Sequence, residues 1–254
     1  MQRTGWRCDL TMNRPDRLNA VTEEMYEGLV KELAAASDDP TVRVVVLRGA
    51  GRAFCVGADL KDHGVAERSE DDKRRYAQFG QDAAAAIMDC SKPVVAAVHG
   101  HAIGAGLELA LACDLSVVAD EAKLRFPEFG LGTFVGGGTT FTLVERVGLT
   151  KARELLLLGR FFRGRDAAAW GLCNEAAPAD DVPQRAEAFA EELHGKAPRS
   201  LAFAKRLLRQ ARDLSIPELL RQERDALAAC MGTPDWREGL AAFREGRNPE
   251  FRGE

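Results

Sequence analysis

The 254-residue sequence predicts an α/β fold with parallel strand pairing, followed by an all-helical C-terminal section. Up to Asp181, short apolar runs rich in β-branched residues alternate with longer segments of helical periodicity. Beyond Asp181 the β-type runs end, and the remaining segments have helical periodicity alone. Strands that alternate with helices usually run parallel in one sheet, because each helix carries the chain back to the end of the sheet where the strand began.

Four short segments predict strands. Residues 7–12 form the first, before a turn that contains Pro15. Residues 42–47, 92–98 and 115–119 are mostly apolar and rich in valine, which is the pattern of strands covered on both faces. We therefore expect a layered structure in which helices pack on a central sheet.

Helices are predicted where apolar residues recur at helical spacing. The first runs from Thr22 to about residue 37. In the C-terminal section, Pro198, Pro217 and Pro234 separate the predicted helices. These helices are expected at residues 182–196, 200–212, 216–231 and 236–244.

The change in composition near residue 197 divides the chain into two parts. We expect a core of residues 1–197 and a helical section of residues 198–254. The helical section contains more apolar side chains than a free tail would expose, among them Leu207, Leu220 and Leu227. These side chains should pack on the core, on another subunit, or on both.

Bulk composition narrows the class of protein. The net charge is −4 and charges of both signs are interspersed, which argues against a nucleic-acid partner. The six cysteines have no C-x-x-C pair and no Cys/His metal spacing, so we expect reduced thiols and no metal site. Because no signal-peptide core or membrane-length apolar run is seen, we expect a soluble cytoplasmic protein without a membrane partner.

Two glycine-bearing turns follow predicted strands directly. They span residues 49–60 and 99–110, and in the second a helix is expected to start at Gly104–Gly106. Unpaired N–H groups at that helix start, with one from the first turn, could stabilise a developing negative charge. The small residues could equally serve close packing of strand against helix. The pattern leaves both interpretations open.

Other glycine-loop chemistries fit less well. Leu109 stands where G-x-G-x-x-G requires its third glycine, which makes dinucleotide binding a weak hypothesis. The sequence also contains no G-x-x-x-x-G-K-[S/T] phosphate loop and no G-x-S-x-G nucleophile elbow. A further flexible turn is expected at residues 136–138.

Two glutamates are candidate acid–base groups. Glu108 lies one turn into an otherwise apolar helix, and Glu128 lies between Phe126-Pro127 and Phe129. A carboxyl group in such surroundings has a raised pKa and can hold or release a proton near neutral pH. The alternative is that each is a structural or surface charge, although their positions beside glycine turns favour chemistry.

Other polar residues suggest weaker sites. For His99 and His101 we favour packing or hydrogen-bonding roles, and for Cys55 a small buried thiol over a nucleophile. Residues 61–78 are highly charged, which indicates either a solvated loop that leads into a helix or a mobile flap beside a site.

Four segments resemble enzymes of the enoyl-CoA hydratase/isomerase (crotonase) family. Residues 13–20 (NRPDRLNA) are similar to the family's N-R-P-x-x-x-N-A opening, and residues 51–60 (GRAFCVGADL) to its G-x-A-F-x-x-G-A-D segment. Residues 98–114 (VHGHAIGAGLELALACD) match its V-x-G-x-A-x-G-x-G-x-E-L-A-x-x-C-D block, and Phe126-Pro127-Glu128 its P-E segment. The resemblance continues into the C-terminal end (DWREG and PEF), so it covers nearly the whole chain in order.

The resemblance implies a spiral of β-β-α units and a helical C-terminal section that forms a homotrimer or a dimer of trimers. It also implies an acyl-CoA thioester substrate, no cofactor beyond the coenzyme A of that substrate, and no metal. The thioester carbonyl would be polarised by the backbone N–H groups of Ala58 and Ala105, and Glu108 and Glu128 would be the catalytic pair. The implied substrate-binding residues are Arg17, Leu18, Ala58, Asp59, Leu60, Lys61, Gly104 and Ala105.

Both glutamates together favour an enoyl-CoA hydratase, which adds water to a 2-enoyl-CoA. The alternatives are a 3,2-enoyl-CoA isomerase that uses Glu128 and a catalytically idle relative that binds acyl-CoA or RNA. Many family members have glycine where Ala105 stands. Alanine retains the N–H, but its methyl group could crowd the acyl group.

Overall fold

A six-stranded sheet forms the centre of the molecule in the computed structural model, which describes residues 1–60 and 69–253. The strand order is β1-β2-β3-β4-β6-β9. Only β1 and β2 pair antiparallel, and every other neighbouring pair in this sheet is parallel. The predicted α/β fold with parallel pairing is therefore confirmed. The strands are β1 (Gln2–Thr4), β2 (Arg7–Met12), β3 (Val44–Gly49), β4 (Val94–Val98), β6 (Leu115–Ala119) and β9 (Glu175–Ala177).

A second, three-stranded sheet lies beside the first. Its strands are β5 (His101–Ile103), β7 (Lys123–Arg125) and β8 (Phe162–Arg163), in the order β5-β7-β8. β5 and β7 each follow a strand of the main sheet within a few residues, so that β4-β5-α4 and β6-β7-α5 repeat a β-β-α order. These strands have two or three residues, which is too short for a periodic pattern to reveal them in the sequence.

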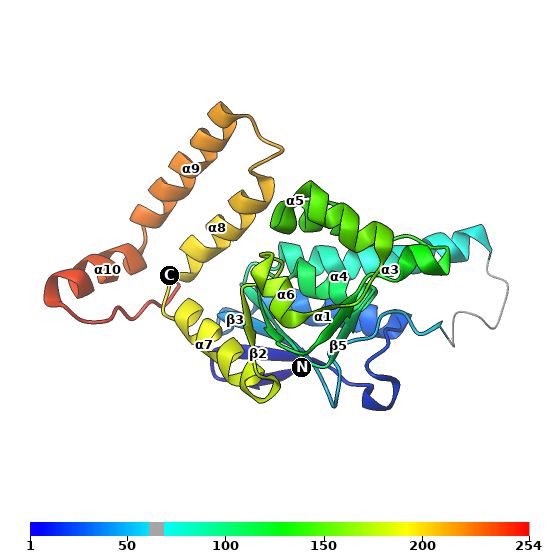
Figure 1. Ribbon diagram of the computed structural model, residues 1–254. Coiled ribbons are helices and arrows are strands. Elements are labelled where there is room, and N and C mark those ends of the chain that lie inside the picture. The colour runs from blue at the N-terminus through cyan, green and yellow to red at the C-terminus, as the bar shows by residue number, and fades with distance from the viewer. Residues whose placement is uncertain (61–68, 254) are drawn as a thin grey trace.

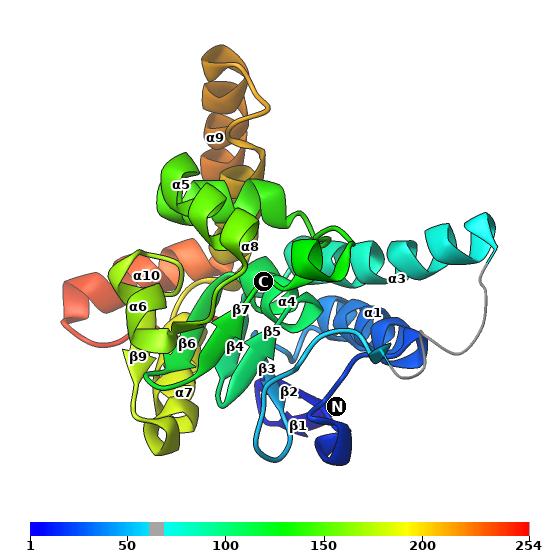
Figure 2. The same ribbon diagram turned by 45° about the vertical axis from the view of Figure 1, so that its right-hand side comes forward.

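Helices pack on the sheets and form the C-terminal part of the chain (Figures 1 and 2). α3 begins after Ser69, so the predicted flap at 61–78 falls partly on residues 61–68, which lie outside the described residues. The helices are α1 (Glu23–Asp38), α3 (Glu70–Asp89), α4 (Ala105–Ala112), α5 (Thr139–Leu158), α6 (Gly164–Ala169), α7 (Val182–His194), α8 (Pro198–Gln210), α9 (Ile216–Met231) and α10 (Pro234–Glu245), with single 3-10 turns at Pro15–Arg17, Glu128–Leu131 and Ala179–Asp181.

The predicted role of the C-terminal prolines was wrong in one respect. Pro198, Pro217 and Pro234 lie in the first turns of α8, α9 and α10 instead of between helices. The missing N–H of proline costs nothing there, because the first N–H groups of a helix have no intrahelical acceptor. These prolines therefore begin the helices that they were expected to separate.

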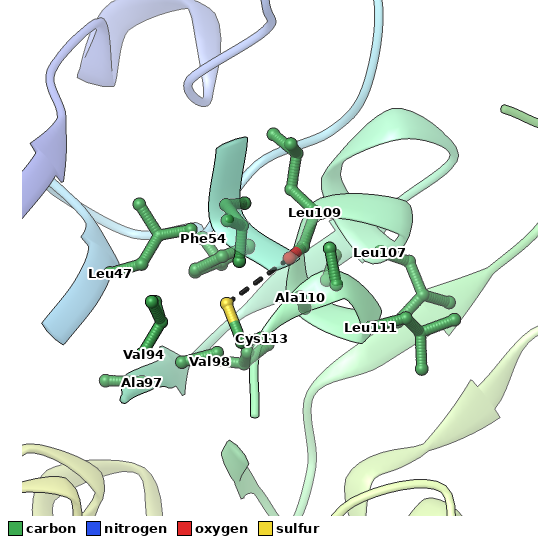
Figure 3. Packing of buried hydrophobic residues seen from close by; sticks show 14 of the residues in the cluster. Leu47, Phe54, Val94, Ala97, Val98, Leu107, Leu109, Ala110, Leu111 and Cys113 are labelled. Carbon is green, nitrogen blue, oxygen red and sulfur yellow. Dashed lines mark hydrogen bonds between the residues drawn. The ribbon is translucent and has the colours of Figure 1, made fainter. Parts of the chain in front are cut away.

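The main sheet and α4 enclose the apolar core. Leu47, Val94 and Val98 from the strands face Leu109 of α4, and Figure 3 shows these side chains together. Of the eight residues of α4, six are buried, so this helix is apolar on nearly its whole circumference. Glu108, on the same helix, is consequently held in a setting with little water.

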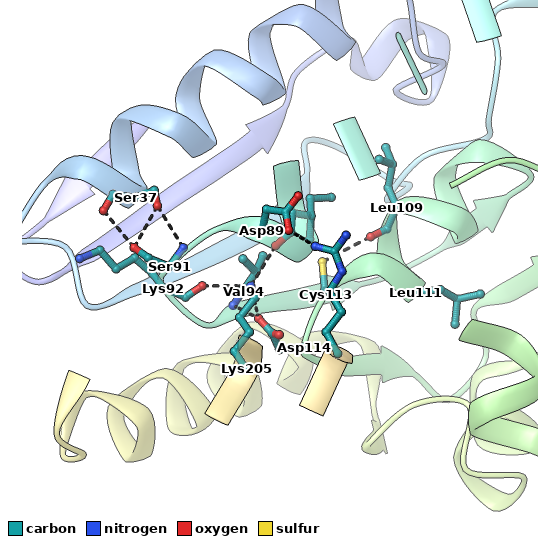
Figure 4. Close-up of polar contacts among 12 residues, drawn as sticks. Ser37, Asp89, Ser91, Lys92, Val94, Leu109, Leu111, Cys113, Asp114 and Lys205 are labelled. Atoms are coloured by element: carbon teal, nitrogen blue, oxygen red, sulfur yellow. Dashed lines mark hydrogen bonds and ion pairs between the residues drawn. The ribbon is translucent and has the colours of Figure 1, made fainter. Parts of the chain in front are cut away.

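The C-terminal arm (α8–α10) extends away from the core (Figure 1). Lys205 of α8 connects the arm to the core. Its Nζ donates to Asp114 Oδ2 at 2.7 Å and to the carbonyl oxygens of Ile87 and Lys92 at 2.9 and 3.2 Å. Asp114 also accepts from the Val94 N–H at 2.7 Å, as Figure 4 shows. Leucine and phenylalanine side chains remain exposed along the arm, including Leu208, Leu227 and Phe243. Packing of the arm on another subunit stays a prediction.

Replacement of Lys205 with methionine should lower the free energy of unfolding by about 2 kcal/mol, because Asp114 would keep its half-buried carboxylate without the ammonium group. Urea denaturation measures this change. Arg221→Met, which removes an exposed Arg221–Glu218 pair on α9, is the control and should leave the unfolding midpoint unchanged. Equal effects of the two substitutions would contradict the anchoring role of Lys205.

Candidate active site

Three backbone segments run side by side and end at the same place. Residues 53–57 pair with β5, since the Cys55 N–H donates to the His101 carbonyl at 3.0 Å and the Ile103 N–H donates to the Cys55 carbonyl at 3.0 Å. On its other edge β5 pairs in parallel with β7. Because the three segments run in the same direction, Ala58, Ala105 and Glu128 are brought together just beyond their ends.

Glycines allow this close approach. A Cβ atom on Gly106 would lie 2.3 Å from the Cys55 carbonyl oxygen, and one on Gly104 would lie 2.6 Å from Glu128 Oε1. Gly104 also has a φ of +52°, which L side chains rarely adopt. Close packing, one of the two interpretations that the sequence left open, is thus present at this turn. The other interpretation, N–H groups that stabilise a developing negative charge, stays a prediction.

The N–H groups of Ala58 and Ala105 belong to two turns that lie close together. Val21 pairs with the carbonyl of Gly57 and the N–H of Asp59, so the Ala58 N–H between them points to the opposite side. Ala105 is the first residue of α4 and has no intrahelical acceptor. A Cβ on Gly57 would lie 3.5 Å from the Ala105 nitrogen, which shows how near the two turns are. Within residues 1–60 and 69–253, neither N–H has an acceptor.

Glu108 is held by a backbone donor. The Gly136 N–H donates to Glu108 Oε1 at 2.8 Å. The pKa of Glu108 is raised to about 7, chiefly because the carboxyl group is buried; the Gly136 hydrogen bond lowers this pKa and the Glu128 charge raises it. Glu108 can therefore accept or release a proton near neutral pH.

Glu128 is buried in a short 3-10 turn. Its side chain is 7% exposed, and its Oε2 has no hydrogen-bond partner within the described part of the chain. Burial raises the pKa of Glu128, while its own backbone N–H and the Arg125 cation lower it. An unpartnered carboxyl oxygen in a dry setting favours the protonated form, which can donate to a bound molecule.

Of the remaining residues predicted to contact the substrate, four lie near the first glycine turn and one falls outside the described residues. Leu18 lies beside the first turn, because its carbonyl accepts from the Val56 N–H at 3.2 Å. Arg17 and Leu60 are exposed near the same turn. Asp59 is buried and accepts from Arg14 at 3.0 Å, so it braces the turn. Lys61 lies outside the described residues.

The side chains of His99, His101 and Cys55 have structural roles, although the backbone of His101 and Cys55 forms part of this arrangement. His99 Nε2 hydrogen-bonds to the Gly51 carbonyl at 2.9 Å, and burial lowers the pKa of His101. Cys55 is fully buried, and burial raises the pKa of its thiol to about 12, which leaves it un-ionised at neutral pH. No cluster of three or more His, Cys, Asp or Glu side chains with metal-binding geometry occurs among the residues whose placement is described.

Two supporting groups were missed in the sequence. The sequence predicts only a flexible turn at Gly136, yet the Gly136 N–H donates to Glu108. Asn19 is fully buried, and its amide donates to the carbonyls of Ala50 and Ala53 at 2.8 Å, which fixes the first glycine turn. The motif around Asn19 was the available signal, whereas nothing local to Gly136 indicates its partner.

The geometry agrees with what comparisons with known proteins show. The family model for enoyl-CoA hydratase/isomerase matches residues 7–254. The chain is 35% identical to a 2,3-dehydroadipyl-CoA hydratase of Escherichia coli, over 96% of this chain and 94% of that protein. It is 31% identical to a carnitinyl-CoA dehydratase of Proteus mirabilis, over 96% and 94%.

A solved structure of an enoyl-CoA hydratase from Bacillus anthracis superposes with a TM-score of 0.95 at 30% identity, covering 100% of this chain and 98% of that one. The chain belongs to the enoyl-CoA hydratase/isomerase (crotonase) family. The crotonase fold implied by the sequence motifs is confirmed. No helix in the described ranges is long and apolar enough to span a membrane.

Substitution of Glu108 with glutamine should stabilise the protein more at pH 8 than at pH 5. In the folded state the pKa of the Glu108 carboxyl group is raised to about 7, so its ionisation lowers the free energy of unfolding. This destabilisation is absent below the ordinary pKa of glutamate and complete above pH 7. We expect a gain of about 3 kcal/mol at pH 8 and less than about 1 kcal/mol at pH 5. Thermal unfolding of Glu108→Gln at both values tests this. Glu191→Gln, at an exposed position on α7, should show no such difference.

Proposed function

We propose that the protein is an enoyl-CoA hydratase, which adds water to a 2-enoyl-CoA to give a 3-hydroxyacyl-CoA. The observation that carries the proposal is the pair Glu108 and Glu128, both with raised pKa values, beside two adjacent backbone N–H groups. A charged acceptor for one proton and a protonated donor of another are what addition of water requires. The names of the relatives from Escherichia coli and Proteus mirabilis support the same class of reaction.

The chemistry follows from the placement of these groups. The thioester carbonyl oxygen accepts hydrogen bonds from the N–H groups of Ala58 and Ala105, which stabilise the enolate charge that develops there. Glu108 takes a proton from water as the water oxygen bonds to carbon 3. Glu128 delivers its proton to carbon 2, so the double bond is lost and no net charge is created. The helix dipole of α4, whose first residue is Ala105, adds to the stabilisation of the oxyanion.

The coenzyme A part of the substrate is assigned to the surface beside the first glycine turn. We place its pantetheine arm along Ala58, Asp59 and Leu60, followed by Lys61, with Arg17 and Leu18 close to it. The exposure of Arg17 and Leu60 leaves both available for such contacts. Assembly into trimers through the C-terminal arm is part of the same proposal, supported by the apolar side chains that the arm exposes.

Glu108→Gln and Glu128→Gln should each lower kcat for hydration of crotonyl-CoA by at least about a hundredfold, because each removes one of two proton transfers. The decrease of absorbance of the conjugated thioester measures this. Binding of the substrate should change little in either variant, since glutamine keeps the shape of glutamate. Absence of hydration in the wild type, with isomerisation of a 3-enoyl-CoA that persists in Glu108→Gln and is lost in Glu128→Gln, would instead support a 3,2-enoyl-CoA isomerase.

The rate of hydration should depend on pH through Glu108. Since Glu108 must be a carboxylate to accept the proton from water, kcat/KM should fall about tenfold per pH unit below about pH 7. Initial rates from pH 5 to pH 9 in buffers of constant ionic strength measure this profile. A profile that stays flat down to pH 5 would contradict the role of Glu108 as the base.

A further inference from the structure

The α-carbon of Gly136 borders a small space beside Glu108. A Cβ atom on Gly136 would lie 3.3 Å from Glu108 Oε2 and 3.5 Å from Gln81 Nε2, and no other atom of a described residue beyond its chain neighbours lies within 4 Å of that position. Glu108 Oε1 is already engaged by the Gly136 N–H. The second carboxylate oxygen and the Gln81 amide therefore both border the position beside the bare α-carbon of Gly136, where no side chain lies.

Gln81 is held at this place by its own helix. Gly80 packs toward the Tyr26 ring, with 3.6 Å between that ring and a Cβ placed on the glycine. Ala84, one turn further along α3, lies 3.3 Å from the corresponding position on Gly137. The backbone around Gln81 is thus fixed against both α1 and the glycine turn, while the Gln81 side chain is accessible to solvent.

The Gln81 amide supplies the hydrogen-bond donor that the Glu108 carboxylate lacks. A water molecule needs two or more polar partners to occupy a defined position, and Glu108 Oε2 offers only an acceptor. The Gln81 NH₂ group is a donor, so it can bind a lone pair of the water oxygen while Glu108 accepts a proton of the same water. Such a water keeps one lone pair free for attack on carbon 3.

We propose that Gln81 is a positioning residue for hydration. Its amide N–H donates to the water molecule that Glu108 deprotonates, and this water lies beside the α-carbon of Gly136. The proposal rests on the proposed hydratase function and adds a third group to the water site. Gln81 is uncharged. The titratable groups that face Glu108 are Glu128, Tyr26 and Cys55. Because Gln81 carries no charge, its effect on the pKa of Glu108 arises from its N–H donor.

The first test compares two glutamines of α3. Gln81→Leu should lower kcat for crotonyl-CoA about tenfold at an unchanged KM, because it removes one hydrogen bond to the attacking water. Gln78→Leu is the matched control: the Gln78 amide is bound to Asp82 at 2.7 Å, and its loss should leave kcat within twofold. Gln81→Glu should move the acidic limb of the pH profile to higher pH, because a second carboxylate disfavours ionisation of Glu108.

The second test adds a methyl group at Gly136 and leaves the residues Glu108 and Gln81 unchanged. Gly136→Ala retains the N–H that binds Glu108 and places a methyl group where the water is proposed to lie. It should lower kcat about as much as Gln81→Leu, and the double variant should be no slower than either single one, because both substitutions disturb the position of the same water. Additive losses, or equal rates for Gln81→Leu and Gln78→Leu, would overturn the proposal.

A titration separates this proposal from the hydratase assignment. If the wild type hydrates no 2-enoyl-CoA, the proposed function fails, and the Glu108 carboxyl carbon can still be followed by NMR in protein with ¹³C-labelled glutamate. Loss of the donor in Gln81→Leu should raise the pKa of Glu108 relative to the wild type and to Gln78→Leu. An unchanged titration in Gln81→Leu would show that the amide does not act on Glu108.

Discussion

Direct contact of backbone with backbone is the constraint on which the site depends. A Cβ on Gly100 would lie 2.0 Å from the Arg52 carbonyl oxygen, and one on Gly106 would lie 2.3 Å from that of Cys55. Only glycine permits this spacing, so residues 53–57 can lie at hydrogen-bonding distance from β5. This contact places the Ala58 N–H beside the start of α4. Without it the two N–H groups would belong to separate loops.

The position of α4 is fixed from both ends. At its C-terminal end the partly buried Arg146 guanidinium donates to the carbonyl oxygens of Leu111 and Cys113 at 2.9 and 2.8 Å, which a helix otherwise leaves without partners. A cation there is favourable, since the helix dipole is negative at that end. The positive end consequently faces the site, where negative charge is expected to develop. Arg146 belongs to α5, which follows the glycine turn that holds Glu108.

Burial of Glu108 and Glu128 favours proton transfer near neutral pH but lowers the stability of the fold. Glu108 and Glu128 would each be ionised at neutral pH in water, and the fold raises both pKa values through desolvation. The cost is compatible with folding because the surrounding core is large and continuous around α4. Polar support is confined to single hydrogen bonds such as that of Gly136, which leaves Glu108 Oε2 free to act.

The sequence by itself determined strands β2, β3, β4 and β6 of the main sheet, most helix positions, and the candidate residues Glu108, Glu128, Ala58 and Ala105, because valine runs, helical spacing and glycine motifs are local patterns. The three-residue edge strands β1 and β9 were not predicted. Only the tertiary structure decided the second sheet, whose strands are too short for periodicity, and the placement of Gln81 and Gly136 around Glu108. Those contacts arise from the packing of α3 and of the turn before α5 on α4. The physical reason is that such packing depends on surfaces distant in the chain, which no single segment encodes.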